Sequence, residues 1–283
     1  MLPRNIADMI QNPLKYVRGF VKFGGQVLRR PRDAMWFLQC YREWQRTAPP
    51  EWRADPSEIK ACLRDRHATA GNARGHYFLQ DLWAGRRVFE KCPAKHVDVG
   101  SRVDGFVAHV ATFCPVEYVD IRPLESRIPR LTGIEGSIQD LPFGDHEVIS
   151  LSSLHVIEHI GLGRYGEPID PAGWTRALEE LQRVLAPGGR LLIGTPCGRP
   201  RVVFHAHRIF DPLQIIDAVP ELKLIEFSLI RDGDAIEWEQ DADPAEALFL
   251  DYGCGLFLFE RSPVNDQDPP SPSGRRGGTA ISR

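Results

Sequence analysis

From Lys95 onward, short β-branched runs alternate with helix-forming stretches, and this alternation constrains the fold more than any other feature. Strands separated by helices pair in parallel, so the pattern predicts a doubly wound α/β fold with helices on both faces of the sheet. The runs with strand character are 96–100, 116–121, 147–152, 190–194, 222–230 and 255–259. A helix capped by Asp170 is expected over 171–185. Helices are also expected to begin at Asp55 and to run over 76–90.

Composition divides the chain into three predicted regions. Residues 1–70 are expected to form a basic helical extension, 71–261 the α/β domain, and 262–283, rich in Pro, Ser, Gly and Arg, a disordered tail. Residues 10–30 carry apolar positions at helical spacing beside a separate stripe of lysines and arginines. Such a helix either lies on an anionic membrane or a partner, or packs its apolar face on the protein's own core.

Charge and cysteine usage exclude several functions. A net charge of −3 gives no basis for nucleic-acid binding, so no nucleic-acid partner is expected. The six cysteines form no C-x-x-C pair, which argues against a zinc ribbon or a redox motif, and no metal site is expected. They are interpreted as reduced thiols of a cytoplasmic protein. Neither a secretory leader nor an apolar run long enough to span a membrane is indicated.

Ligand chemistry is concentrated at the ends of the first two strands of the predicted sheet. Open α/β sheets bind ligands beyond the carboxyl ends of their strands. Gly100 directly follows the first strand, where a glycine lets the backbone turn and approach a ligand closely. Asp120 ends the second strand, where an acid can accept both hydroxyls of a ribose. Together these two positions predict a ligand that contains adenosine.

Four segments in order extend this prediction to a family. Asp98-Val99-Gly100 with Asp120 resembles motifs I and II of class I S-adenosyl-L-methionine-dependent methyltransferases. Segments 136–143 (GSIQDLPF), 154–159 (LHVIEH) and 180–191 (ELQRVLAPGGRL) resemble three later stretches of that family.

A narrower resemblance is to the uncharacterised DUF268 family. It is carried by residues 97–106 and 152–166 and extends through 206–210.

The methyltransferase resemblance implies a seven-stranded, mostly parallel, Rossmann-like sheet that binds S-adenosyl-L-methionine. The residues it would place at the cofactor are Asp98, Gly100, Ser101, Arg102, Asp120, Ile121, Ser137, Ile138 and Ser153. The chain departs from the family where motif I has its second and third glycines, which are here Arg102 and Asp104. Arg102 either pairs with the carboxylate of the cofactor or blocks the pocket.

Methyl transfer to a hydroxyl requires a base that removes its proton. The candidate bases are His155, Glu158 and His159 after the fourth strand, and His207 after the fifth. An alternative role for Glu158 and His159 is to shape the cofactor pocket. The predicted function is therefore O-methylation of a small molecule or of a sugar or glycan precursor.

Other patterns in the sequence point to other functions. H-x-x-E-H at 155–159 matches a zinc-peptidase pattern, but it follows a strand instead of lying on a helix. D-x-D at 232–234 and 241–243 leaves a glycosyltransferase as one alternative. The altered motif I leaves another, a methyltransferase-like scaffold that binds without turnover.

Overall fold

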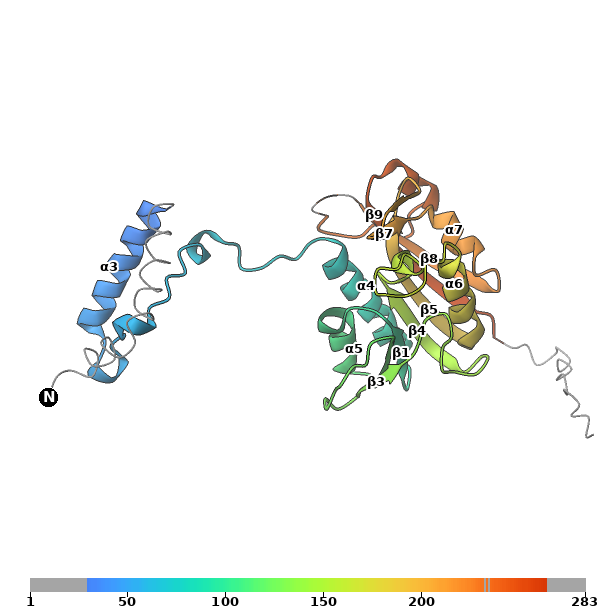
Figure 1. Cartoon of the computed structure of the whole chain (residues 1–283), viewed down its shortest axis with the longest axis horizontal. Coiled ribbons are helices and arrows are strands. Elements are labelled where there is room, and N and C mark those ends of the chain that lie inside the picture. The colour runs from blue at the N-terminus through green and yellow to red at the C-terminus, as the bar shows by residue number, and fades with distance from the viewer. Residues whose placement is uncertain (1–29, 232, 234, 264–283) are drawn as a thin grey trace, which may run out of the picture. The chain divides into compact units, whose positions relative to one another are not determined.

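The computed structural model describes residues 30–231, 233 and 235–263 (Figure 1). The chain divides into two compact units, Met1–Asn72 and Ala73–Arg283. The predicted basic helix lies outside the described residues except for residue 30, and so does the predicted tail beyond residue 263. Among the described residues, no helix has the length and apolar content needed to cross a lipid bilayer.

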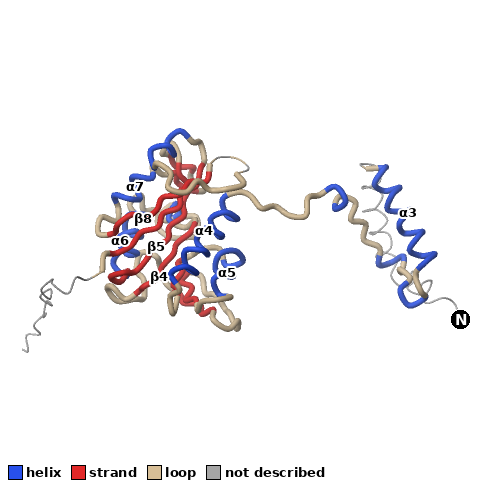
Figure 2. The backbone as a smooth tube through the Cα atoms, turned by 180° about the vertical axis from the view of Figure 1, so that it is seen from behind, coloured by secondary structure: helices blue, strands red, loops and turns tan. Residues whose placement is uncertain are grey.

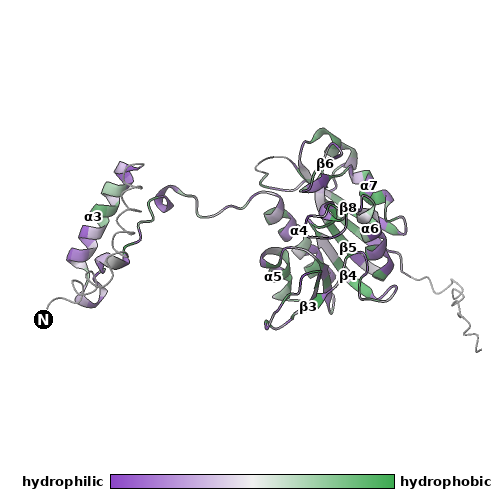
Figure 3. Ribbon diagram, in the orientation of Figure 1, coloured by the Kyte–Doolittle hydropathy of each residue, from purple (hydrophilic) through white to green (hydrophobic). Residues whose placement is uncertain are grey.

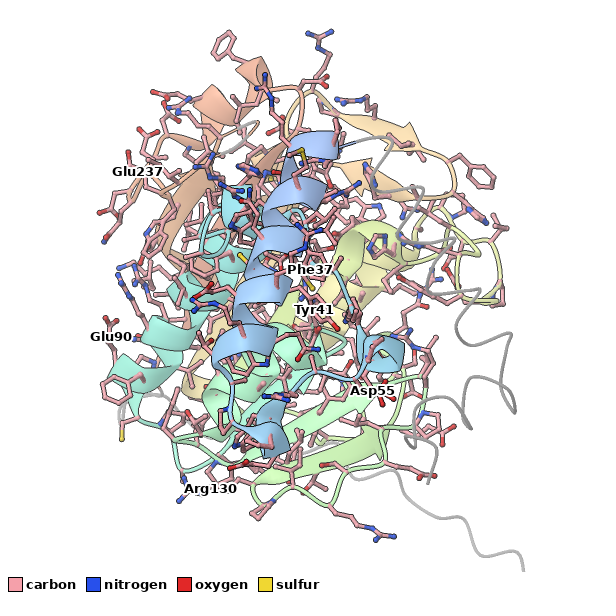
Figure 4. The ribbon with its side chains drawn as sticks, turned by 90° about the vertical axis from the view of Figure 1, so that its left-hand side faces the viewer. Phe37, Tyr41, Asp55, Glu90, Arg130 and Glu237 are labelled. Carbon is pink, nitrogen blue, oxygen red and sulfur yellow. The ribbon has the colours of Figure 1, made fainter. Side chains whose placement is uncertain are left out.

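The first unit contains one long described helix, α3 (Pro31–Thr47), which was not predicted. Hydrophilic and hydrophobic residues alternate along it (Figure 3), and Phe37 and Tyr41 extend from the same side (Figure 4). After α3 the chain folds back, because the Gln45 side-chain amide bonds both backbone groups of Ala54. Three single 3₁₀ turns follow, η1 (Pro50–Trp52), η2 (Pro56–Glu58) and η3 (Asp65–His67). The helix expected from Asp55 is thus only the turn η2.

The second unit is built on a seven-stranded sheet with strand order β3-β2-β1-β4-β5-β9-β8. Only β9 runs antiparallel to its neighbours. The strands are β1 (His96–Val99), β2 (Val116–Asp120), β3 (Leu131–Glu135), β4 (Val148–Leu154), β5 (Leu185–Cys197), β8 (Leu222–Ile230) and β9 (Gly253–Arg261). A separate hairpin pairs β6 (Arg201–Val203) with β7 (His207–Ile209). The predicted doubly wound, mostly parallel fold is confirmed.

Helices cover both faces of this sheet (Figures 1 and 2). One face carries α4 (His76–Lys91) and α5 (Ala108–Ala111), the latter preceded by a short π-helical turn, η4 (Val103–Val107). The other carries α6 (Gly173–Val184) and α7 (Pro212–Asp217). Two 3₁₀ segments, η5 (Ile157–His159) and η6 (Pro244–Phe249), lie in the connections.

Two hydrophobic cores result, one on each face of the sheet. Trp83 of α4 and Phe106 of η4 are fully buried in the first core, and Leu178 and Leu181 of α6 in the second. A buried ion pair also ties α4 to the sheet, because the Arg87 guanidinium of α4 bonds both carboxylate oxygens of Glu226 in β8. The indole N–H of Trp83 donates to the same carboxylate at 2.8 Å, so neither buried charge lacks a partner.

Several element boundaries differ from those expected, and one strand was not expected. Helix α6 begins at Gly173, and the Asp170 carboxylate bonds the backbone N–H of Ala172 just outside it, so Asp170 is not its cap. Strand β5 begins at Leu185 and not at residue 190. The segment 187–189 (Pro-Gly-Gly) lies inside this strand, where the pairing with β4 shifts in register. Strand β3 was not predicted at all.

Candidate functional site

A cleft opens where the strand order reverses. From β1 the chain continues to β2 and β3 on one side, whereas β4, the other neighbour of β1, leads to β5 on the opposite side. Beyond the carboxyl ends of β1 and β4 the two connections diverge and leave a hollow. It is lined by Val99, Gly100, Val119, Asp120, Ile121, Arg122, Gly136, Ile138, His155, Val156, His159, Ile160 and Tyr165.

Gly100 forms the floor of this cleft at the end of β1. Its φ of 74° lies in the left-handed region. A Cβ atom there would stand 3.1 Å from a methyl carbon of Val156, on the loop after β4. The turn therefore requires a glycine, as its position in the sequence predicted.

Hydrogen bonds between Asp98 and Ser101 stabilise the turn at Gly100. The Asp98 carboxylate accepts hydrogen bonds from the Ser101 hydroxyl at 2.6 Å, from the Ser101 backbone N–H at 3.1 Å and from the Ser152 hydroxyl of β4. Complete burial raises the pKa of Asp98 to about 7 against these bonds, which lower it. Both residues were predicted at the cofactor. Neither residue lines the cleft, and together they fix the conformation of the loop that follows β1.

Asp120 reaches the cleft from β2, but its carboxylate already has partners. Arg122 donates to it from its backbone N–H at 2.8 Å and from its guanidinium at 2.9 and 2.8 Å. The Tyr118 hydroxyl adds a bond of 3.0 Å. Burial alone would raise the pKa of Asp120, but these bonds hold it below its ordinary value, so the group is an anionic acceptor. A ribose bound here has to compete with the Arg122 side chain, which is largely exposed and can swing away.

Arg102 does not line the cleft. Its guanidinium pairs with Asp104 at 2.6 Å and lies over the ring of Tyr77. The glycine of this loop that is closely approached is Gly105, where a Cβ atom would meet a carboxylate oxygen of Asp81. In this conformation Arg102 neither fills the cleft nor points into it.

The remaining predicted cofactor residues divide between the cleft and its support. Ile121 and Ile138 line it. The Ser137 hydroxyl accepts a bond from the backbone N–H of Gln139 in the turn beside Ile138. The Ser153 hydroxyl donates to the carbonyl of Val99 and is fully buried between β4 and β1. Ser153 therefore joins the strands of the sheet.

The predicted bases after β4 form a connected group. His155, a non-glycine residue with a φ of 54°, bonds through Nδ1 to Glu158 Oε1 at 2.7 Å. Glu158 is buried, yet its pKa stays below the ordinary value because the imidazoles of His155 and His159 offset the cost of burial. His159 Nε2 lies 3.8 Å from the same carboxylate oxygen. Burial lowers the pKa of His159, which favours its neutral form.

The fourth predicted base lies near this group, close enough for Glu158 and His159 to act on its pKa. His207 begins β7, and its ring packs against Tyr252 at 5.2 Å between centroids. Partial burial lowers its pKa. Of the two D-x-D runs, 232–234 is only partly described, and in the other the Asp243 carboxylate caps η6 by accepting a bond from Ala245.

Four residues at this end of the sheet were missed by sequence reasoning. They are His76, Asp81, Tyr252 and Cys254, which come from α4, the loop before β9 and β9 itself. The His76 ring stacks on those of His155 and Tyr252. Asp81 is buried, and burial raises its pKa. A helix start and a late strand carry no local signal of a site, so only their meeting in the fold identifies them.

Residues 145–226 match the family described as a Caenorhabditis protein of unknown function, DUF268. The predicted resemblance to DUF268 is confirmed over that segment, which holds the loop after β4 and the β6–β7 hairpin. The predicted run at 97–106 lies outside it. No curated protein sequence matches the chain.

Solved structures of low sequence identity also resemble the chain. The N-methyltransferase NodS from Bradyrhizobium japonicum WM9, with S-adenosyl-L-homocysteine, has 16% identity over 79% of this chain and 97% of its own, with a TM-score of 0.44. Geranyl diphosphate C-methyltransferase from Streptomyces coelicolor A3(2) has 13% identity over 64% and 79%, with a TM-score of 0.44. The [4+2]-cyclase SpnF has 12% identity over 65% and 81%, with a TM-score of 0.45. The fold assignment itself rests on this chain's own strand order.

Proposed function

We propose that the protein is an S-adenosyl-L-methionine-dependent methyltransferase that binds its cofactor in the cleft between β1 and β4. One observation carries this proposal: the glycine after β1 and the acid ending β2 meet in the same cleft at the point where the strand order reverses. Asp120 would accept the ribose hydroxyls, and Ile121 and Ile138 would pack against the adenine. The loop after Gly100, supported by Asp98 and Ser101, would carry the methionine moiety.

For the chemical step we propose His159 as the base that accepts a hydroxyl proton from the acceptor. It lines the cleft, and its lowered pKa favours the neutral ring that can take up a proton. The buried Glu158 carboxylate, 3.8 Å from Nε2, would then stabilise the imidazolium that forms. His155 and His207 were also predicted as bases, and this proposal gives neither of them the proton-accepting role.

The acceptor is proposed to be a small molecule or a sugar or glycan precursor with a free hydroxyl. Tyr77, Tyr165 and Tyr252 lie around the histidines and offer aromatic faces on which a sugar ring can pack. A cytoplasmic location is proposed as well, supported by six cysteines that are all free. Peripheral membrane contact through residues 10–30 stays a prediction.

Calorimetric titration with S-adenosyl-L-homocysteine tests the cofactor site. We expect micromolar binding to the full chain. Asp120→Asn should weaken it by at least about tenfold, because charge-assisted hydrogen bonds of about 1.5–3 kcal/mol are lost. Asp217→Asn, an exposed acid on α7, serves as the matched control and should bind as the unaltered chain does.

Absence of binding to the unaltered chain would overturn the methyltransferase proposal. It would favour the scaffold alternative, which one observation supports: the Arg122 guanidinium already occupies the Asp120 carboxylate that would hold the ribose. Equal binding by Asp120→Asn would place the ligand outside the cleft.

A further inference from the structure

Three potential metal ligands meet at the carboxyl end of the sheet. His76 is the first residue of α4, His155 directly follows β4, and Cys254 is the second residue of β9. One ligand atom from each lies within 4.8 Å of the other two. Cys254 is fully buried and His155 nearly so, whereas His76 is partly exposed. Three separate elements thus contribute to one cluster with one open side.

The spacing of the donor atoms suits a tetrahedral ion. His155 Nε2 lies 3.7 Å from Cys254 Sγ. Zinc with bonds of about 2.0–2.1 Å to nitrogen and about 2.3 Å to sulfur separates two such ligands by about 3.6 Å. An ion can therefore bridge these two atoms with little movement. His76, on the partly exposed side, has a ring nitrogen within 4.8 Å of both atoms, and its ring, now stacked on those of His155 and Tyr252, would turn to complete three ligands.

Glu158 orients the central ligand. Because His155 Nδ1 bonds to Glu158 Oε1 at 2.7 Å, its Nε2 is left facing Cys254. A carboxylate that holds the far nitrogen of a histidine is the usual support of a metal-binding imidazole. Among the described residues, the second oxygen of this buried carboxylate, Oε2, has no hydrogen-bond partner. This carboxylate is therefore available to compensate a positive charge beside His155.

We propose that His76, His155 and Cys254 bind a thiophilic divalent cation of the zinc class. One thiolate with two imidazoles is a ligand set that suits zinc. On binding, the Cys254 thiol loses its proton to solvent as the metal–sulfur bond forms. Three protein ligands leave a fourth position, which an oxygen of an acceptor or water can take. The ion would lie beside the cleft, because His155 also lines that cleft.

Cobalt titration of the full chain, stripped of metal by a chelator, tests this inference. We expect one Co²⁺ per chain, a thiolate-to-cobalt charge-transfer band in the near ultraviolet, and d–d bands of tetrahedral intensity that zinc abolishes. Cys254→Ser should remove the charge-transfer band. Cys114→Ser, a buried cysteine at the opposite end of the strands, should retain it.

Two further variants keep the test decisive if Cys254→Ser fails to fold. His76→Gln changes a partly exposed side chain and should weaken cobalt binding at least about tenfold. Glu158→Gln should weaken it about 10- to 100-fold through His155. Near-ultraviolet circular dichroism checks the fold of each.

Failure of the unaltered chain to bind cobalt, or binding unchanged in His76→Gln, would overturn the inference. The metal-site inference does not depend on the proposed methyl transfer. If the chain bound S-adenosyl-L-homocysteine but not cobalt, only the metal-site inference would fail. If it bound cobalt but not S-adenosyl-L-homocysteine, only the methyltransferase proposal would fail.

Discussion

The two ring nitrogens of His159 have different surroundings. Nδ1 lies 2.7 Å from the carbonyl oxygen of Ala206, which only accepts hydrogen bonds, and 3.2 Å from an Arg164 guanidinium nitrogen, which only donates them. Because that guanidinium donates to the same carbonyl at 2.8 Å, the shorter contact assigns the proton to Nδ1. Nε2 is then unprotonated and lies near Glu158. Glu158 raises the pKa of this ring, and Arg164 and His155 lower it. His207 lies close enough to interact with the same ring. Burial outweighs Glu158.

We therefore expect His159 to titrate below the ordinary histidine value of about 6.5 and to be neutral at physiological pH. Because the pKa is lowered, the ring takes up a proton only below that lowered pKa. Its capacity as a base is therefore present above this pKa and is lost as the pH falls through it. Nuclear magnetic resonance of nitrogen-labelled histidine measures this, with His159→Gln for assignment. Glu158→Gln should lower the midpoint further. A midpoint above 6.5, or a proton on Nε2 in the neutral ring, would contradict this prediction.

Single residues also mark the limit of sequence reasoning. The position of Asp120 at a strand end was predictable because it follows from a local pattern. That Arg122, two residues later, bonds both of its carboxylate oxygens depends on the direction of the chain after β2. Arg102 shows the same limit, since its pairing with Asp104 follows from the path of the loop and not from residue type.

At the level of elements, α4 and the turn η4 come into close contact at one glycine. Gly105 departs from helical geometry, with φ −118° and ψ −108°. Its hydrogen atoms face Asp81, which is buried and bonded to Gln80 at 3.4 Å. No side chain fits between the two elements at this point.

Gly105→Ala should destabilise the protein by about 1–3 kcal/mol, because its Cβ would be 2.2 Å from Asp81 Oδ2 in a packed interior. Denaturant unfolding measures the change. Gly85→Ala, in the same helix α4 with open space around its Cβ position, is the matched control and should stabilise by about 0.5–1 kcal/mol. Removing the carboxylate as well, in Asp81→Ala with Gly105→Ala, should recover part of the loss. An unchanged midpoint in Gly105→Ala would refute the close contact.

The strand that was not predicted is the most exposed strand of the sheet. Strand β8 was predicted with its full bounds, because five consecutive buried residues give a clear signal. Strand β3, at the edge of the sheet, is mostly exposed and contains Gly133, so its sequence carries little strand character. The start of β5 was placed too late because proline and glycine residues there read as a helix stop, whereas pairing with β4 extends the strand through them.

In the whole molecule, the cleft belongs to one of the two compact units. All residues that line it lie between Val99 and Tyr165, inside the unit Ala73–Arg283. We propose that the predicted α/β domain, 71–261, folds independently of the extension that precedes it. A chain that begins at Ala73 should therefore bind S-adenosyl-L-homocysteine with unchanged affinity. Calorimetry on the shortened and full chains measures this, and weaker binding by a folded shortened chain would show that residues 1–72 contribute to the site.

Local patterns in the sequence were enough to predict the doubly wound sheet, the turn at Gly100 and the acid at Asp120. Strand and turn preferences depend on neighbouring residues, so they can be read without the fold. The proximity of His76, His155 and Cys254 could not be predicted from local patterns. His155 lies 79 positions after His76, and Cys254 lies 99 positions after His155. Strand order and register, which depend on packing across the whole sheet, bring them within 4.8 Å of one another.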